Sequence, residues 1–387
     1  MSGLPVNLSE REMREIAGKF VSQSMRIGKR NGRYEEVRIL HNTTDPSCTR
    51  FAEIVEEECW RMGAHTISLG YSSKREKLRY ELKPEDSLAE MSRIGKAIAK
   101  NVDVTIFIGE EDDPNWAKEL HHKLRISAPV REKIRRILDR RRVRWAYFGW
   151  PIPEAANRYG CPVSRFRRIF FDSIRETFSG ELQRLCLTYK RALKGKREIR
   201  ITCDDGTDLR FSIKGRPILV DDGVISDEDL KRGDVGVNIP AGEVFVAPIE
   251  SSAEGEIIFD DVAIPGFGKV KGLKLEFREG RISKFRAESG ADIFRKFLDA
   301  NTGDKDRIAE FGIGTNRMAR YTGGSIIIDE KIFGTVHIAI GNNRGAYHGK
   351  NRASVHLDMI KDMRNGEVQA DGEAVIVKGR PAEMSSA

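Results

Sequence analysis

The sequence predicts two domains of different class: an α/β domain with a mostly parallel sheet over residues 1–194, then an α+β domain with mainly antiparallel strands over residues 195–387. Length gives the first reason, because 387 residues are too many for one ordinary hydrophobic core. The second is that apolar strands and helices alternate in the first part of the chain, whereas strand pairs joined by tight turns dominate after Glu198.

The first domain is expected to alternate strand and helix, which implies right-handed crossovers and helices on both faces of the sheet. The turns after its strands lack the spaced glycines of a dinucleotide loop and the Gly-Lys-Ser/Thr of a P-loop, so we expect a scaffold or lid. A helical region over residues 163–192 leads out of the domain. The expected strands are residues 37–40, 66–69, 102–108 and 143–148, and the expected helices are residues 50–63, 88–100 and 129–140.

The second domain is expected to consist of hairpins. Turn sequences at 204–206, 279–280 and 371–372 separate pairs of apolar runs, and a helix is expected at 291–300. The expected strand pairs are residues 199–202 with 209–213, 272–277 with 282–285, and 366–369 with 374–377.

Composition indicates a soluble cytoplasmic protein. Hydrophobic residues make up 39% and charged residues 33% of the chain, and no apolar stretch approaches the ~18 residues of a membrane span. The cysteines are odd in number and lack metal-ligand spacing, which fits a reducing compartment. They are Cys48, Cys59, Cys161, Cys186 and Cys203.

A net charge of +8 and the arginines within residues 131–144 raise the alternative of a nucleic-acid-binding protein. Apolar residues recur at helical spacing in the same segment, so we interpret it as an amphipathic helix with a solvated arginine face. The sequence adds no aromatic platform or glycine-rich RNA-binding motif, which argues against nucleic acid as a partner.

Three histidines, His337, His348 and His356, fall within twenty residues near the C-terminus. His356 and Asp358 stand two apart in an apolar segment that is typical of a strand, so their side chains project to the same face. Imidazole and carboxylate on one strand can hold Zn²⁺, Mn²⁺, Fe²⁺ or Co²⁺. The simpler interpretation is a surface ion pair.

Glutamates in unusual surroundings accompany these histidines. Glu243 and Glu310 lie among glycines and apolar residues, where an unpaired charge is costly and needs a cation or a hydrogen-bonded partner. The alternative is a pair of ordinary strand-edge glutamates. Glu330 is a further candidate, although its neighbours Asp329 and Lys331 are equally consistent with a solvated turn.

Taken together, these segments resemble the thermophilic metalloaminopeptidases of the aminopeptidase T and S type, which are leucyl aminopeptidase-like metallopeptidases. Their order along the chain also matches that family, most specifically between residues 240 and 359, and more diffusely before that. The matching segments are GEVF at 242–245 with AP at 247–248, Glu310 with GIGTN at 312–316, GTVHIAIG at 334–341, and HLD at 356–358.

The resemblance implies two divalent metal ions, with zinc, cobalt, manganese and magnesium as candidates. It also implies that a tyrosine follows the first histidine by seven residues, a position that Arg344 occupies here. Arg344 would bring positive charge toward an anionic substrate group, and Tyr347 is the nearest substitute for the tyrosine. The metal ligands implied are Glu243, Glu310, His337, His356 and Asp358, with Glu330 as a sixth.

The predicted function is therefore a metal-dependent aminopeptidase acting on a peptide or small-molecule substrate. Two metals can activate a shared water and polarise the scissile carbonyl, with Glu310 as the bridging ligand and Glu330 or Glu250 as the proton-handling group. The alternative is a ring-cleaving dioxygenase of the hydroxypyridine type with one Fe(II) held by His337, His356 and Asp358. The presence of both Glu243 and Glu310 favours the two-metal hydrolase. We also expect a homodimer, because members of the resembled family associate and the antiparallel strands have edges to cover.

Overall fold

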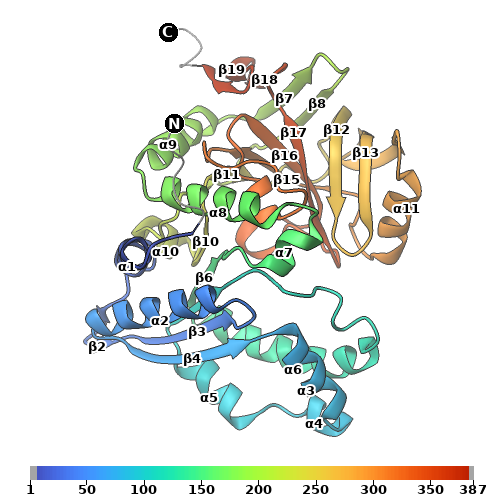
Figure 1. The fold of residues 1–387 in the computed structure, drawn as a ribbon. Helices are drawn as coiled ribbons and strands as arrows, with labels where there is room; N and C mark the ends of the chain where they lie inside the picture. The colour runs from blue at the N-terminus through green and yellow to red at the C-terminus, as the bar shows by residue number, and fades with distance from the viewer. Residues whose placement is uncertain (1–6, 383–387) are drawn as a thin grey trace. The chain divides into compact units, whose positions relative to one another are not determined.

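The structure, a computed structural model, describes residues 7–382 and divides into two compact units (Figure 1). The first unit comprises the chain up to Phe171 together with Gly223–Ile239, and the second comprises Asp172–Asp222 and the chain from Pro240 onward. Among the described residues, no helix is both long and apolar enough to cross a membrane.

The division between units falls between Phe171 and Asp172 rather than near Lys194, where the sequence placed the domain boundary. Helix α9 (Glu181–Leu193) explains the difference, because its buried residues Leu182, Leu185 and Tyr189 belong to the core of the second unit. The predicted helical region over 163–192 is in fact two helices, α8 (Val163–Thr177) and α9, separated by Gly180 in the left-handed conformation.

The first unit contains a five-stranded parallel sheet in the order β10-β6-β5-β3-β4, which confirms the predicted α/β class. The fifth strand was not predicted: β10 belongs to the segment that returns from the second half of the chain. It pairs with β6, and the ring of Trp145 lies where a Cβ on Gly236 would be. The strands are β3 (Glu36–Asn42), β4 (His65–Tyr71), β5 (Val104–Ile108), β6 (Arg144–Phe148) and β10 (Gly236–Ile239).

Helices lie on both sides of this sheet, with α2 on one side and α5 on the other in Figure 1. Asp45 caps α2 and Pro46 occupies its first turn, where its missing N–H costs nothing. The helix predicted at 88–100 is interrupted, because the Ser92 side chain accepts a hydrogen bond from the Gly95 N–H and starts a new helix. The helices are α1 (Glu10–Lys19), α2 (Pro46–Arg61), α3 (Ser73–Leu82), α4 (Glu85–Ala89), α5 (Arg93–Asn101), α6 (His121–Arg140), α7 (Pro153–Arg158) and α10 (Asp227–Arg232).

The arginine-rich segment is the second half of α6. Arg131, Arg135 and Arg136 are exposed there, whereas Ile134 and Ile137 are half-buried, as the amphipathic interpretation requires. Arg144 has a different role: it begins β6 and is buried in an ion pair with Glu35.

The second unit contains two antiparallel sheets, which confirms the predicted α+β class. One has eight strands in the order β14-β13-β12-β8-β7-β18-β19-β20, and its pairs β7–β8, β13–β14 and β18–β19 are the three predicted hairpins. These strands are β7 (Glu198–Cys203), β8 (Asp208–Ser212), β12 (Glu254–Ile264), β13 (Gly268–Arg278), β14 (Arg281–Arg286), β18 (Gly366–Ala370), β19 (Glu373–Val377) and β20 (Arg380–Pro381).

The other sheet has five strands in the order β17-β16-β15-β11-β9. Both sheets contribute to one apolar core, which α9 and α11 (Ala291–Ala300) complete. The central strands β15 and β16 are buried along their whole length. The strands are β9 (Leu219–Asp221), β11 (Glu243–Val246), β15 (Ile308–Gly314), β16 (Thr335–Gly341) and β17 (His356–Asp362).

Candidate metal centre

One face of the five-stranded sheet carries all five residues that the resemblance implies as metal ligands. Glu310 lies opposite Ala339, which in turn lies opposite Asp358, so the two carboxylates share a row across three strands. Side chains directly opposite each other in antiparallel strands project to the same face. The same register places the following residues on this face: Glu243, Glu310, His337, His356 and Asp358.

The opposite face of these strands is apolar. Val244, Phe311, Ile338 and Leu357 alternate with the polar residues and are buried in the core of the unit. The period of two therefore separates the two functions of each strand: every second residue packs the core, and the residues between them build the site.

Glycine makes room for the imidazole of His337. A Cβ on Gly312, which lies directly opposite His337, would be 2.1 Å from the Nε2 atom and 2.2 Å from the Cε1 atom of that ring. No side chain other than hydrogen fits there while the ring keeps its place.

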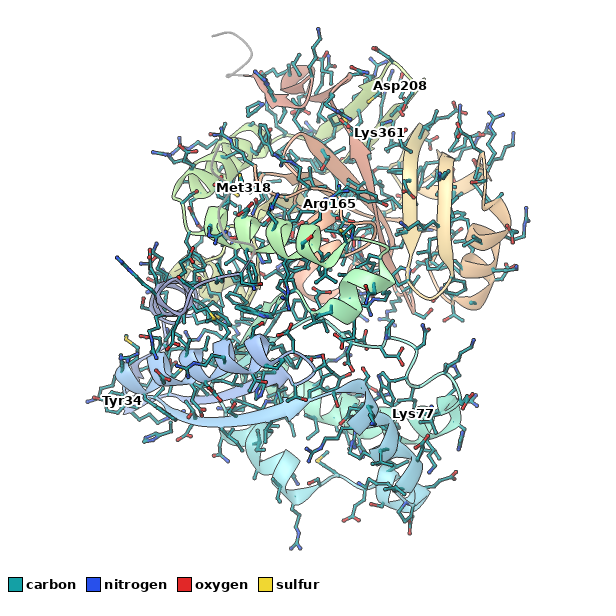
Figure 2. The ribbon with its side chains drawn as sticks, viewed as in Figure 1. Tyr34, Lys77, Arg165, Asp208, Met318 and Lys361 are labelled. Carbon is teal, nitrogen blue, oxygen red and sulfur yellow. The ribbon has the colours of Figure 1, made fainter. Side chains whose placement is uncertain are left out.

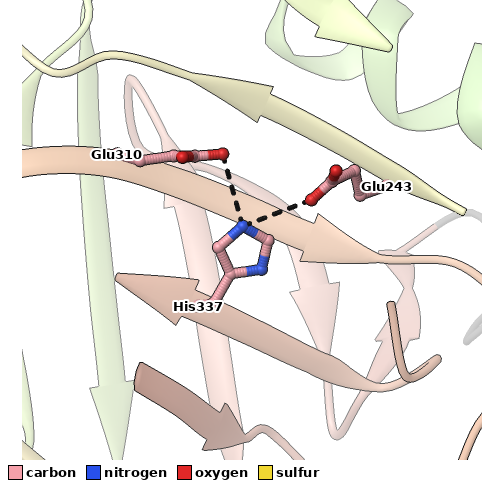
Figure 3. Close-up of side chains that lie close together, drawn as sticks. All are labelled: Glu243, Glu310 and His337. Atoms are coloured by element: carbon pink, nitrogen blue, oxygen red, sulfur yellow. Dashed lines mark hydrogen bonds and ion pairs between the residues drawn. The ribbon is translucent and has the colours of Figure 1, made fainter. Parts of the chain in front are cut away.

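The ligand atoms form two groups that share Glu310. In the first, His337 Nε2 lies 3.4 Å from Glu243 Oε2 and 3.5 Å from Glu310 Oε1 (Figure 3). In the second, His356 Nε2 lies 3.1 Å from Glu310 Oε2 and 3.2 Å from Asp358 Oδ1. The two oxygens of Glu310 thus face different imidazoles.

This donor set suits a divalent cation. Glu243 Oε2 is a buried carboxylate oxygen without a hydrogen-bond partner among the described residues, and such an oxygen is costly unless a cation lies near it. Carboxylate oxygens with imidazole nitrogens are ligands for zinc, manganese, cobalt or iron. His348, the third histidine of the sequence cluster, is exposed and belongs to neither group.

A backbone contact on the Nδ1 side fixes the orientation of the His356 ring. Its Nδ1 lies 2.7 Å from the Asn342 carbonyl oxygen, and a hydrogen bond donated from Nδ1 leaves Nε2 as the ligand atom of the neutral ring. The ring of Tyr347 stacks on His356 with centroids 4.8 Å apart and an interplanar angle of 18°. Tyr347 therefore lies at the site, as the sequence interpretation allowed.

The close charges shift the pKa values of the centre. Burial alone would lower the pKa of His337, but the hydrogen bond and negative charge of Glu310, with Glu243, raise it to about 9. Burial would also lower the pKa of His356, but Asp358 and Glu310 raise it well above its usual value. Burial raises the pKa of Glu243 to about 7, although Lys331 acts in the opposite direction.

The segment around Glu330 is not a solvated turn. Asp329, at the end of α12 (Ile326–Asp329), is buried and accepts hydrogen bonds from Thr322 and Gly324. Lys331 is fully buried, with Nζ 2.9 Å from Glu330 Oε1 and 2.7 Å from Glu243 Oε1. Because Glu330 shares the Lys331 ammonium with Glu243, its carboxylate lies next to the centre, although it belongs to neither ligand group.

The other two candidates occupy different environments. Arg344 is exposed in the loop between β16 and β17. Glu250 is buried, and both of its oxygens are engaged: Oε2 pairs with Arg216 at 2.6 Å and Oε1 accepts the Lys350 N–H at 2.6 Å. These contacts make Glu250 an anchor for the loop that carries Tyr347, and a proton-handling role does not fit them.

Sequence patterns alone missed three contributors, Asp221, Lys331 and Asn343. Asp221 on β9 lies opposite Glu243 and pairs with Lys331, and Asn343 ties the loop to β15 through the Ala309 carbonyl at 3.1 Å. Asp221 sits next to Asp222 and Gly223 in the sequence, which is also typical of an exposed turn, so only the strand register reveals it.

A cavity of about 90 Å³ opens beside His356 and Asp358. Its walls are mainly apolar, from Val262, Ala263 and Ile326, with Asp261 and Tyr321 among the polar lining residues. The candidate centre therefore has room for a substrate group next to the ligands of β17.

The fold and the geometry of the site are consistent with a metal-dependent enzyme whose candidate centre lies in the second unit. The sequence matches the thermophilic metalloprotease (M29) family over residues 27–380, and the chain belongs to that family. Because members of this family are metalloproteases, the chain is a metallopeptidase that binds divalent metal.

Two solved structures share the fold. Wild-type AmpT from Thermus thermophilus superimposes with a TM-score of 0.71 at 18% identity, covering 96% of this chain and 99% of that one. The 2,5-dihydroxypyridine dioxygenase from Pseudomonas putida superimposes with a TM-score of 0.61 at 16% identity, covering 97% and 98%. At these identities the likeness shows the fold alone.

A sequence relative comes from the same bacterium. The 2,5-dihydroxypyridine 5,6-dioxygenase of Pseudomonas putida is 24% identical over 209 residues, a match that spans 51% of this chain and 57% of the relative. The match thus covers little more than half of that enzyme's length.

Gly312→Ala tests the close packing of the imidazole. We expect metal affinity to fall by about tenfold or more, because the new methyl displaces the His337 ring, while the fold is retained. Calorimetric titration with Mn²⁺ or Zn²⁺ and circular dichroism measure the two effects. Gly95→Ala is the control, since its Cβ would meet Ser92 at an ordinary 3.6 Å. Unchanged metal affinity in Gly312→Ala would contradict the assignment.

Metal binding is expected to strengthen as pH rises. With a pKa of about 9, His337 is protonated at neutral pH in the metal-free protein, so a bound ion must displace that proton. Affinity should rise by about tenfold per pH unit between pH 7 and 9 for each proton displaced. The stability that protonated His337 gives the metal-free fold is complete below pH 6.5 and is lost as pH rises through about 9. Titrations across this range that show a constant affinity would refute the expectation.

Proposed function

We propose that this chain is an aminopeptidase that hydrolyses the first peptide bond of its substrate at a centre of two divalent metal ions. The observation that carries the proposal is the orientation of Glu310, whose Oε1 faces His337 and whose Oε2 faces His356. One oxygen for each ligand group is what a carboxylate bridging two ions offers.

The residues divide between two positions. Glu243 and His337 would hold one ion, His356 and Asp358 the other, and Glu310 would serve both. When bound, two such ions supply a water of lowered pKa and an electrophile for the scissile carbonyl. Zinc, cobalt, manganese and magnesium are the candidate ions; the mixed imidazole and carboxylate set favours the first three.

Two further residues complete the proposal. Glu330 would take the proton from the attacking water and return it to the leaving amine, because burial raises the pKa of its carboxylate above the usual value and so makes it a better proton acceptor. Burial and the charges of Glu310 and Asp358 raise the pKa of Tyr347 well above its usual value, so its hydroxyl stays protonated. In that state Tyr347 can donate a hydrogen bond to the carbonyl oxygen as negative charge develops there.

An exopeptidase follows from this arrangement. With metal held by these residues, the centre would offer a site for the free N-terminal amine next to the scissile carbonyl, and an internal peptide bond has no such amine. The side chain of the first residue would enter the cavity beside His356 and Asp358.

The second candidate function is the one-iron dioxygenase, which the relative from Pseudomonas putida supports. It would use His337, His356 and Asp358 as ligands. Such a centre leaves the Glu243 carboxylate, 3.4 Å from His337, without a role. The grouping of the four other candidate ligands, Glu243, His337, His356 and Asp358, around Glu310 therefore favours the hydrolase.

Metal analysis of the purified protein with an aminoacyl-anilide assay tests the proposal. We expect two divalent ions per chain, loss of hydrolysis on chelation, and recovery on adding metal. Glu310→Gln should bind one ion at most and lose about 100-fold or more in kcat, because a neutral amide bridges poorly. Glu288→Gln, at an exposed glutamate, is the control. One iron per chain with ring-cleaving activity and no peptide hydrolysis would establish the second candidate instead.

Arg344 is proposed to recognise the free carboxylate of a short substrate. A bidentate contact from the exposed guanidinium would add about 1.5–3 kcal/mol, so Arg344→Ala should raise KM for a free dipeptide much more than for its amidated form. Tyr347→Phe should instead lower kcat for both substrates. Steady-state kinetics on the substrate pair measure this, and equal effects of Arg344→Ala on the two would remove Arg344 from substrate binding.

A further inference from the structure

Lys331 is a lysine without solvent contact that touches three carboxylates. Its Nζ lies 2.7 Å from Glu243 Oε1, 2.9 Å from Glu330 Oε1 and 3.2 Å from Asp221 Oδ2, and its side chain is 0% exposed. Burying an ammonium group is costly, and three anionic partners are the compensation that the fold provides.

The two oxygens of Glu243 have different partners, the Lys331 ammonium on one side and the candidate metal position on the other. Oε1 binds the ammonium, and Oε2 faces His337 Nε2 in the candidate centre. Lys331 therefore shares a ligand with the metal position without occupying it.

The charges of the region indicate what this arrangement does. Five carboxylates meet here, those of Asp221, Glu243, Glu310, Glu330 and Asp358, and Lys331 is the permanently charged cation in contact with three of them. Two divalent ions together with one ammonium would balance five carboxylates. Without metal, the carboxylates repel one another, and the ammonium offsets part of that repulsion.

We propose that Lys331 is a tethered counter-ion of the centre: it keeps the carboxylates assembled in the metal-free protein and competes with the metal for their charge. Lys331 is thus a positioning residue that moderates metal affinity and lets the chain fold before metal arrives. The inference rests on the metal-binding part of the proposed function and is independent of peptide hydrolysis.

Lys331→Met, which keeps an unbranched side chain one atom shorter and removes the charge, tests the proposal. In the metal-free protein we expect the melting temperature to fall by about 5–10 °C, because three carboxylates lose their cation. Metal should restore most of that loss, so that the metal-induced rise in melting temperature is larger than in the wild type. Titration calorimetry with Mn²⁺ should show a Kd at least tenfold lower than that of the wild type.

Lys361→Met is the matched control. Lys361 (Figure 2) is also buried and paired with a carboxylate, Asp205, but it touches none of the five acidic residues of the centre. This variant should lower the melting temperature equally with and without metal and leave the Kd unchanged. A merely structural Lys331 would behave in the same way as this control.

The outcomes separate the possibilities. Equal or weaker Mn²⁺ binding by Lys331→Met, or equal destabilisation with and without metal, would overturn the proposal. If the variant does not fold without metal, refolding from urea decides: recovery only with Mn²⁺ supports the counter-ion role, and failure with and without Mn²⁺ contradicts it. A wild type that binds Mn²⁺ but cleaves no peptide would refute the aminopeptidase and leave this test valid, whereas a wild type that binds no divalent metal would refute both.

Discussion

Concentrated negative charge in the interior is the constraint around which the second unit is organised. Glu243 and Glu310 are almost fully buried, on strands whose other residues pack the core. Charges in such a place persist only with cations nearby, and these are Lys331, the protonated imidazole of His337 in the metal-free protein, and the divalent metal that the family binds. Glycines at the contact points, Gly312 above all, follow from the same constraint, because ligands that converge this closely leave no room for neighbouring side chains.

Much of this architecture could be predicted from local patterns. The alternation of strand and helix gave the parallel sheet, the turn sequences gave the hairpins, and the spacing of His356 and Asp358 placed both on one face of β17. These features depend on the period of each element and on short turns, which are properties of neighbouring residues. The ligand set came from a resemblance to a family, and the structure brings all five of those residues to one face of a sheet.

What could not be predicted depends on contacts between distant parts of the chain. The pattern at Asp329-Glu330-Lys331 is that of a polar turn, and its burial becomes visible only when β11 is placed beside β9 and β15. For the same reason Glu250 was a plausible proton carrier in the sequence and is a loop anchor in the structure, since its partners Arg216 and Lys350 are far from it along the chain. Ser92 is a local signal for a helix start, but the helical spacing of apolar residues over 88–100 led to the prediction of one continuous helix.

The return of β10 to the first unit has a consequence for how the chain can be divided. Because Gly223–Ile239 belongs to the sheet of residues 36–148, the polypeptide passes between the units three times, and no single cut separates them. A fragment ending at Lys194 would lack β10, so one edge of β6 would be unpaired and the indole of Trp145 would lose its contact with Gly236. An exposed strand edge of that kind promotes aggregation, so truncation at Lys194 would yield an insoluble product, whereas a nick in the chain after Asp222 would leave β10 able to associate with the other four strands.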